Sequence, residues 1–408
     1  MPETTPAHNA TLLEKALFEV KRIIVGQDRM IERMFVALLS RGHCLLEGVP
    51  GVAKTLAVET VAQVVGGSFA RIQFTPDLVP ADIVGTRIYR QGAEKFDVEL
   101  GPVFVNFLLA DEINRAPAKV QSALLEVMAE QQVSIGGRTH QVPQPFLVMA
   151  TQNPIEQEGV YPLPEAQRDR FLFKVLVGYP SDVEEREIVY RMGTSPPEPN
   201  QVFAPEDLLR LQRKADEVFV HNALVDYAVR LVLSTREPAA HGLGEIAPLV
   251  QYGASPRASL GLVRASRAFA LLRGRDYVLP QDIQDLAPDV LRHRLVLSYD
   301  ALADGIPAEQ VVTRVLQAVP LPSVTPRQSA EGRATGGAPT VPRSGGYGQP
   351  PATSPAAVTS QARPAQPVKA VPFGPPAPAS GVPTSGAPTS GAPASTVRPA
   401  QPGNGPMA

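Results

Sequence analysis

The chain has 408 residues, a formal net charge of -2 and a single cysteine, Cys44. Residues 321–408 hold six of the 38 basic residues but one of the 40 acidic residues, so the preceding part is acidic, with 32 basic and 39 acidic side chains. This balance argues against nucleic acid as a partner, and one cysteine excludes a disulfide within the chain. No apolar run reaches the roughly 18 residues of a membrane span, and the start of the chain lacks the pattern of a signal peptide. We therefore expect a cytoplasmic protein without direct membrane insertion.

Two amphipathic helices are predicted at the start of the chain, at residues 12–24 and 30–38, because apolar residues recur there at helical spacing. Gly26 and Gln27 separate these helices. In a nucleotide-binding domain this turn could line an adenine pocket, which makes both residues candidates for nucleotide binding. The alternative is a turn that only breaks the helix.

A glycine-rich octapeptide follows a short apolar run at 43–46 and precedes an amphipathic segment at 56–65. Its residues are Gly48, Val49, Pro50, Gly51, Val52, Ala53, Lys54 and Thr55. A strand, a glycine-rich turn and a helix in this order are typical of a phosphate-binding P-loop, in which backbone N–H groups and the helix N-terminus face the phosphates. We expect Lys54 to contact the β- and γ-phosphates of ATP and Thr55 to bind Mg²⁺. Leu56, the next residue, completes the predicted nucleotide-binding set.

Ala53 departs from the general pattern G-x-x-x-x-G-K-[ST], which has a glycine at that position. A methyl group is the smallest possible addition, and we expect a right-handed helical backbone at residue 53, which would tolerate it. The alternative for the octapeptide is a glycine-rich turn that ends in Lys-Thr without binding phosphate.

An apolar run at 105–110 predicts a buried strand that ends in Asp111 and Glu112. Because open α/β sheets bind ligands at the carboxyl ends of their strands, we expect Asp111 to hold Mg²⁺ and Glu112 to polarise the attacking water. The alternative is an acidic helix start, since a helical run follows at 119–130. Between the P-loop and this strand, we predict another strand at 69–74.

Further polar candidates follow the next predicted strand, at 146–150. The Asn153 amide could hold the attacking water or the γ-phosphate, although Pro154 alone would explain a turn there. Arg168 and Arg170 precede a last predicted strand. Such arginines usually belong to a solvated face, and the alternative is a positive charge supplied across a subunit interface. Two short insertions are also predicted, a loop at 75–80 and a hairpin at 132–146.

From residue 180 to 320 the pattern is helical and predicts a second, α-helical domain. Its expected helices cover residues 183–192, 205–218, 222–234, 255–272 and 280–295. Ser255 is a predicted N-cap with Pro256 at the first helical position. Arg257 then lies in the first turn, where a cation opposes the helix dipole, which hints at a phosphate partner. Residues 321–408 are rich in Pro, Ala, Gly, Ser and Thr and predict a disordered tail.

Four motifs in this chain resemble those of the MoxR family of AAA+ ATPases, over roughly residues 12–318. They are GVPGVAKT at 48–55, LADEINRA at 109–116, ATQNPIEQEG at 150–159 and YPLPEAQ at 161–167. The resemblance implies a three-layer α/β nucleotide-binding domain over residues 1–179 and an α-helical lid over 180–320. Ala53 is usual in that family.

The resemblance also implies roles for single residues. Asn153 corresponds to sensor 1, Arg257 to sensor 2 and Arg170 to an arginine finger that acts on a neighbour's nucleotide, with Arg168 as the other candidate for the finger. A subunit's own site would then hold Lys54, Asp111 and Arg257. The insertion near 75–85 and the hairpin at 132–146 would be pore-side elements.

The function implied is that of an ATP-hydrolysing, Mg²⁺-dependent homo-oligomer, a hexameric ring that matures or remodels partner protein complexes. Proteins with a von Willebrand factor A domain are the implied clients. Two alternatives remain, a metal-chelatase motor subunit and a scaffold that binds nucleotide without hydrolysing it.

Overall fold

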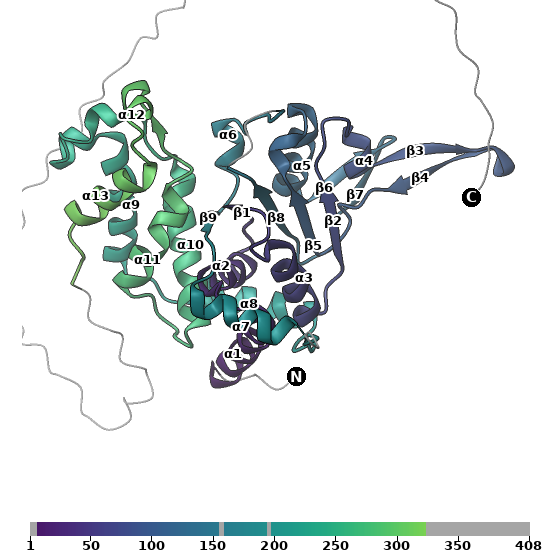
Figure 1. Ribbon diagram of the computed structural model, residues 1–408, viewed down its shortest axis with the longest axis horizontal. Coiled ribbons are helices and arrows are strands. Elements are labelled where there is room, and N and C mark those ends of the chain that lie inside the picture. The colour runs from purple at the N-terminus through teal and green to yellow at the C-terminus, as the bar shows by residue number, and fades with distance from the viewer. Residues whose placement is uncertain (1–5, 155–158, 194–196, 324–408) are drawn as a thin grey trace, which may run out of the picture. The chain divides into compact units, whose positions relative to one another are not determined.

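The computed structural model describes residues 6–154, 159–193 and 197–323. The tail predicted at 321–408 lies outside these residues from position 324 onward. The first part of the chain is a parallel sheet between helices, and the second part is almost entirely helical (Figure 1). The predicted α/β class with a helical second part is confirmed.

Five parallel strands form the central sheet in the order β2-β5-β8-β1-β9. They are β1 (Cys44–Gly48), β2 (Phe69–Gln73), β5 (Phe107–Asp111), β8 (Leu147–Gln152) and β9 (Phe173–Val177). The apolar runs at β5 and β8 reflect their central positions, since strands covered on both faces carry few polar residues. Because all strands are parallel, the residues that follow them gather at the carboxyl edge of the sheet. The residues that precede them gather at the opposite, amino edge.

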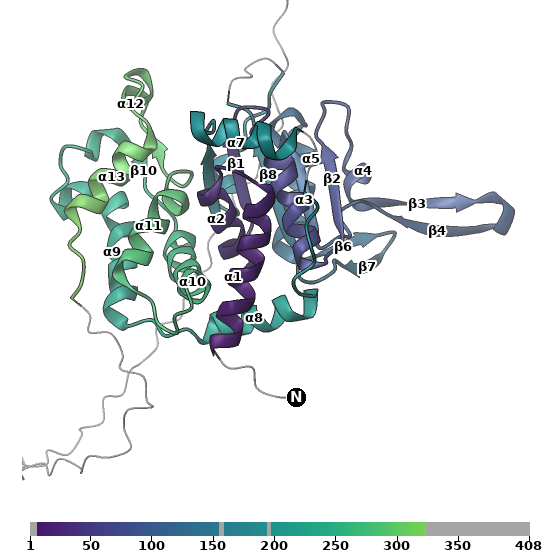
Figure 2. The ribbon, with the colours of Figure 1, turned by 60° about the horizontal axis from the view of Figure 1, so that its bottom comes forward.

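Helices cover both faces of the sheet (Figure 2). They are α1 (Pro6–Ile23), α2 (Asp28–Leu39), α3 (Lys54–Val65) and α5 (Ala118–Glu130). Leu46 and Leu109 pack with buried residues of α1, α2 and α3. The alternate residues Leu45 and Leu108 face the other way, toward α5. This alternation produces the three layers.

Two hairpins extend from this layer. A short helix, α4 (Pro80–Val84), leads into β3 (Gly85–Arg90) and β4 (Lys95–Leu100), a ribbon that projects from the sheet (Figure 1). The sequence predicted a loop at 75–80 and did not predict these two strands. The hairpin predicted at 132–146 is present as β6 (Gln132–Ile135) and β7 (Arg138–Gln141). Val133 pairs with His140 and Ile135 with Arg138, around a turn formed by two glycines.

The second part contains every helix that the sequence predicted and two that it did not, α12 and α13. The helices are α7 (Asp182–Met192), α8 (Pro205–Glu217), α9 (Asn222–Arg236), α10 (Pro256–Leu272), α11 (Pro280–Leu291), α12 (Tyr299–Ala303) and α13 (Ala308–Ala318). A four-residue helix, α6 (Glu165–Arg168), precedes β9. Two short strands, β10 (Val250–Tyr252) and β11 (Val296–Leu297), pair with each other.

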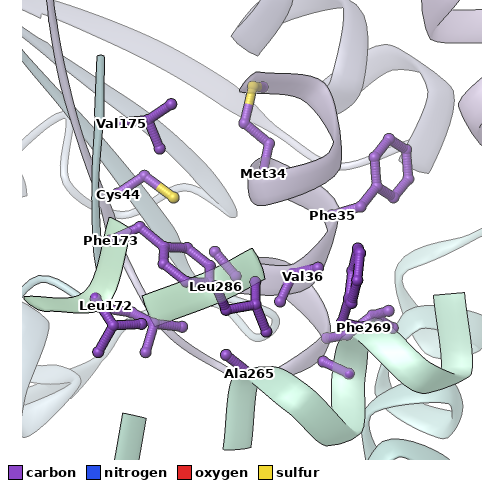
Figure 3. Packing of buried hydrophobic residues seen from close by; sticks show 14 of the residues in the cluster. Met34, Phe35, Val36, Cys44, Leu172, Phe173, Val175, Ala265, Phe269 and Leu286 are labelled. Carbon is purple, nitrogen blue, oxygen red and sulfur yellow. The ribbon is translucent and has the colours of Figure 1, made fainter. Parts of the chain in front are cut away.

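The helices after residue 180 share a hydrophobic core with the sheet domain. Figure 3 shows Phe269 and Ala265 of α10 and Leu286 of α11 in the same cluster as side chains of α2 and β9. A buried ion pair reinforces this contact, with Arg33 Nε 2.7 Å from Asp289 Oδ2. Within the ranges that the structure describes, no helix combines the length and the apolar character that a membrane crossing requires.

Candidate active site

The P-loop connects the end of β1 to the start of α3. A Cβ at Gly48 would lie 2.3 Å from the Val177 carbonyl oxygen, so only glycine allows β9 to approach this closely. Gly51 has φ +83°, which favours glycine, and the space beside it is open. Lys54 Nζ donates to the Gly48 carbonyl at 2.6 Å and thus folds back over the loop.

The other predicted P-loop residues differ in exposure. Val52 is buried and Val49 packs against the core, whereas Pro50 is exposed. Thr55 and Leu56 are half-buried in the first turn of α3. Val52 therefore anchors the loop to the core, while Pro50 and Gly51 are exposed.

Ala53 does not have the right-handed conformation that the sequence analysis expected. Its backbone is left-handed, with φ 58° and ψ 22°, directly before the first residue of α3. Such a conformation is unusual for a residue with a side chain and costs roughly 1–2 kcal/mol. The reason is the shape of the turn, which must redirect the chain before the helix begins; a small methyl group is the most that this position accepts at low cost.

The Lys54 ammonium group lies in a partly desolvated site. Burial lowers the pKa of Lys54, and the negative charges of Asp111, Glu112 and Glu47 act in the opposite direction. These three carboxylates come from β1 and from the end of β5, so the positive charge lies at the carboxyl edge of the sheet. An anion bound here would meet a cation that water screens poorly.

Thr151 of β8 connects the two candidate acidic residues. Its hydroxyl donates to Asp111 Oδ1 at 2.5 Å and accepts the Glu112 backbone N–H at 2.8 Å. Glu112 has φ 56°, so the chain turns sharply after Asp111 and directs the two side chains differently. Thr151 is not among the residues predicted from the sequence, although its place directly after a predicted apolar strand was a usable signal.

Three further polar residues contact this acidic pair and were also missed. Arg71 Nη2 lies 2.6 Å from Asp111 Oδ2, and Gln73 Nε2 donates to Glu112 Oε2 at 2.7 Å. Arg115 Nε lies 3.0 Å from the same Glu112 oxygen. Arg71 and Gln73 belong to β2, whose place beside β5 could not be read from the sequence; Gln73 is in register with Asp111.

Asn153 and the Gly26-Gln27 turn lie at the same edge of the sheet as the P-loop. Asn153 follows Gln152, which is in register with Glu47 on β1, and its side chain is buried. Gln27 Nε2 donates to the Gly178 carbonyl at 3.1 Å, just beyond the end of β9. The structure thus gathers the predicted glycine turn, P-loop, acidic pair and amide at one edge.

The two candidate finger arginines lie at the opposite, amino edge, because they precede β9. Arg170 is exposed, and its Nη1 donates to the Leu125 carbonyl at 2.6 Å. Among the described residues, no carboxylate pairs with Arg170. Arg168 is half-buried and pairs with Glu165 at 3.3 Å. Of the two, Arg170 is the more available to a partner.

Arg257 also lies at the amino edge, which differs from the expectation that it joins Lys54 and Asp111 in one site. The predicted N-cap is confirmed, with Ser255 Oγ accepting the Arg257 N–H at 3.2 Å. A cavity of about 340 Å³ is lined by Arg257, Arg170 and His43. His43 precedes β1 and the P-loop follows it, so a five-residue strand, roughly 15 Å long, separates the two edges. The fold of α10 across the start of β9 determines this placement, which helix periodicity does not reveal.

The residues at the carboxyl edge fit Mg²⁺-ATP. The left-handed residues 51 and 53 and the space beside Gly51 suit a chain that wraps phosphates, and Lys54 supplies a desolvated positive charge. Among the described residues, no three His, Cys, Asp or Glu side chains form a metal cage. Mg²⁺ needs none, since it binds through one or two protein ligands together with phosphate oxygens and water.

Comparison with known families agrees with this geometry. A family described as "ATPase family associated with various cellular activities (AAA)" matches residues 43–173, which run from the start of β1 to the start of β9. The AAA lid domain matches residues 245–315.

Relatives of known name or structure extend the match over most of the described chain. Chaperone MoxR1 of Mycobacterium tuberculosis is 72% identical over 312 residues, covering 76% of this chain and 83% of that protein. Protein MoxR of Methylorubrum extorquens is 35% identical, covering 74% of this chain and 93% of that protein. A crystal structure from Cytophaga hutchinsonii has a TM-score of 0.74 and 45% identity, covering 78% of this chain and 97% of the other.

Proposed function

Because the chain belongs to the MoxR family of AAA+ ATPases, we propose that it binds Mg²⁺-ATP at the carboxyl edge and hydrolyses it between subunits of a homo-oligomeric ring, as a chaperone that remodels partner proteins. One observation carries the proposal: Lys54 and the acidic pair lie at one edge of the sheet, and Arg170 and Arg257 lie at the other. A head-to-tail contact between copies would bring these edges together.

Each residue has a distinct role in this proposal. The P-loop amides and Lys54 bind the phosphates, with Gly26, Gln27 and Leu56 near the base and ribose. Thr55 and Asp111 would hold Mg²⁺, which neutralises the charge of the phosphate oxygens. Glu112 orients and deprotonates the attacking water, and Asn153 holds that water or the γ-phosphate.

In the described state, other side chains bind both members of the acidic pair, Asp111 and Glu112. Arg71 forms an ion pair with Asp111. Gln73 donates a hydrogen bond to Glu112, and Arg115 forms an ion pair with the same carboxylate. These contacts engage the carboxylate oxygens that Mg²⁺ and the attacking water would need. Binding of Mg²⁺-ATP would therefore require Asp111 and Glu112 to exchange these partners.

Arg170 and Arg257 supply positive charge to a neighbour's γ-phosphate in this proposal. Charge builds on the equatorial oxygens during in-line attack, and an arginine delivered to them accelerates the reaction by roughly 10³ to 10⁵. A ring of six subunits closes such head-to-tail contacts, and we propose this number. The exposed hairpins would face the client, for which a protein with a von Willebrand factor A domain is our candidate.

Purified full-length chain should release phosphate from ATP only when Mg²⁺ is present. Glu112→Gln should bind ATP with wild-type affinity and hydrolyse it at least 10-fold more slowly, since an amide is no general base. Lys54→Ala should lose ATP affinity by roughly 10- to 100-fold, through loss of a charge-assisted hydrogen bond. Lys95→Ala, which removes a lysine from the hairpin tip, is the matched control and should behave as wild type.

The outcomes also separate the two alternatives. Absence of phosphate release from assembled protein saturated with Mg²⁺-ATP, with and without partners, would indicate a scaffold. Co-purification with a subunit that inserts magnesium or cobalt would indicate a chelatase motor. A Glu112→Gln pull-down, in which bound ATP persists, should retain the client.

A further inference from the structure

Asp169 lies directly before Arg170 and connects its segment to the second part of the chain. Ser255 Oγ donates to Asp169 Oδ2 at 2.8 Å, and Arg294 Nε donates to Oδ1 at 2.8 Å. Arg257 Nη1 lies 3.8 Å from Oδ2. The Asp169 carboxylate thus contacts Ser255 and Arg257 at the start of α10, and it also contacts Arg294, which follows α11.

Arg294 extends this link to the backbone around Arg170. Its guanidinium donates to the carbonyls of Leu172 at 3.1 Å and Phe171 at 2.6 Å. Burial lowers the pKa of Arg294 to about 10, while the charge of Asp169 acts to raise it, so the side chain remains a cation at neutral pH. The Arg294 side chain is 3% exposed, and a buried cation needs a partner, which Asp169 provides.

The consequence is a fixed spacing between the two exposed arginines. The backbone on the C-terminal side of Arg170 is held by Arg294, and the start of α10 is held by Ser255. Asp169 joins both. We propose that Asp169 is a positioning residue that holds Arg170 and Arg257 as one unit, so that both enter the nucleotide site of a neighbouring subunit together. This inference rests on the proposed trans action of Arg170.

Asp169 could instead serve only to attach the second part of the chain to the sheet domain. Other contacts already make that attachment, however. Arg33 pairs with Asp289 in the core, and Arg273 at the end of α10 pairs with Glu32 of α2 at 2.9 Å. Arg273→Gln removes a link from the same helix without touching the Asp169 cluster. It is therefore the matched control for an attachment role.

The test compares full-length Asp169→Asn, Arg170→Ala, Arg273→Gln and wild type. Asparagine keeps the shape of the side chain but not its charge. We expect Asp169→Asn to keep the wild-type Kd for ATP, because the subunit's own P-loop lies at the other edge, and to lower kcat by roughly 10- to 100-fold through misplacement of the arginines. Arg273→Gln should keep the wild-type kcat. Asp169→Asn mixed with Glu112→Gln subunits should regain activity, since its defect lies in the neighbour's site.

A second variant covers the case in which Asp169→Asn fails to fold. Ser255→Gly removes the hydroxyl bound to Asp169 but remains an acceptable N-cap, within a few tenths of a kcal/mol. It should lower kcat at unchanged Kd, and Ser255→Thr, which keeps the hydroxyl, should restore it.

Failure of the two proposals gives different results. Wild-type kcat in Asp169→Asn and Ser255→Gly, beside a strongly impaired Arg170→Ala, would overturn the positioning role alone. The role is equally overturned if Asp169→Asn and Arg273→Gln lose melting temperature and activity in parallel. Wild-type kcat in Arg170→Ala would overturn the trans mechanism itself.

Discussion

Ala53 combines a side chain with a left-handed backbone at the point where the P-loop becomes a helix. Ala53→Gly should relieve the steric cost of roughly 1–2 kcal/mol, less the greater entropy of glycine in the unfolded chain, for a net gain of up to about 1 kcal/mol. Ala53→Val should destabilise the protein, because a β-branched residue is far less tolerant of this conformation. Urea unfolding of the three proteins measures both effects. Equal stability of the glycine and valine variants would show that the backbone here is not left-handed.

The buried His43 predicts that the protein loses stability in mild acid. Its Nδ1 accepts the Val148 N–H at 3.0 Å, and its Nε2–H donates to the Met128 carbonyl at 3.3 Å. Burial lowers the pKa of His43 from 6.5 to about 4. The unfolded chain therefore takes up a proton near pH 6.5 while the folded chain does not. The stabilisation is complete above that pH and is lost as the pH falls toward 4.

His43 alone should lower the free energy of unfolding by roughly 3 kcal/mol between pH 7 and pH 4. Burial also lowers the pKa of His293, which adds to the loss with the same sign. Free energies of unfolding measured from urea titrations across this range should fall with pH. His43→Gln keeps a donor and an acceptor and should flatten the dependence, whereas His241→Gln, at an exposed position, should not. An unchanged slope in His43→Gln would contradict the assignment.

At the scale of secondary structure, periodicity predicted most elements but not their neighbours. The apolar runs of β5 and β8 and the P-loop were recognisable because their signals are local. Arg71 was not assigned to the site, since its closeness to Asp111 depends on β2 lying beside β5, whereas Thr151 directly follows a predicted apolar strand and could have been selected. Likewise, the first turn of α10 indicated an anion partner for Arg257, but only its packing across the start of β9 reveals the edge to which it belongs.

The ribbon of β3 and β4 was missed for a different reason. Its side chains are largely exposed, so the sequence lacks the clear alternation of a half-buried strand. Its base depends on a close approach of two glycines, where a Cβ at Gly101 would lie 2.2 Å from the Ile83 carbonyl oxygen. Cross-strand contacts stabilise the rest, including Tyr89 and Phe96 with ring centroids 5.1 Å apart.

Most side chains of this ribbon are exposed and its strands pair with each other, although Val98 packs against the core. The ribbon should therefore be largely dispensable for folding and nucleotide binding. Replacing residues 86–99 by an Asn-Gly turn joins Gly85 to Leu100, which are opposite in register. We expect little change in melting temperature or in the Kd for ATP, and loss of client binding. Deletion of the β6–β7 hairpin is the contrast, since Val133 and Ile135 are core residues and their loss should unfold the chain. Loss of ATP affinity in the β3–β4 replacement would place the ribbon in the nucleotide site.

At the scale of the whole molecule, the proposed mechanism would make one subunit an incomplete enzyme, because the candidate residues lie at two separate edges of the sheet. The P-loop, Asp111 and Glu112 occupy the carboxyl edge, and Arg170 and Arg257 occupy the amino edge. In the proposed ring, a heterologous contact repeated around the closed assembly would complete every site with its neighbour's arginines. Activity should therefore depend on protein concentration, because dilution below the dissociation constant of the assembly removes the neighbour's arginines from each site.

Mixing two inactive variants tests this division directly. Arg170→Ala should bind ATP almost normally and hydrolyse it poorly, because the neighbour's site loses its arginine. Glu112→Gln should also bind ATP and hydrolyse it poorly, because its own site loses the general base. In a randomly mixed ring, about a quarter of the interfaces pair an intact Glu112 with an intact Arg170 from the neighbour, so the mixture should recover up to about that fraction of the wild-type rate. Phosphate release at constant total protein measures the recovery.

The control for this experiment is Arg168→Ala. Arg168 is half-buried and paired with Glu165, so its removal should leave hydrolysis largely intact, whereas the exposed Arg170 has no such restraint. If co-assembled Arg170→Ala and Glu112→Gln recover nothing, and Arg168→Ala is the variant that loses hydrolysis, the finger is Arg168. If Arg170→Ala is inactive and mixing fails although both variants co-assemble and Arg168→Ala is active, Arg170 does not act on a neighbour's nucleotide and the trans mechanism is wrong.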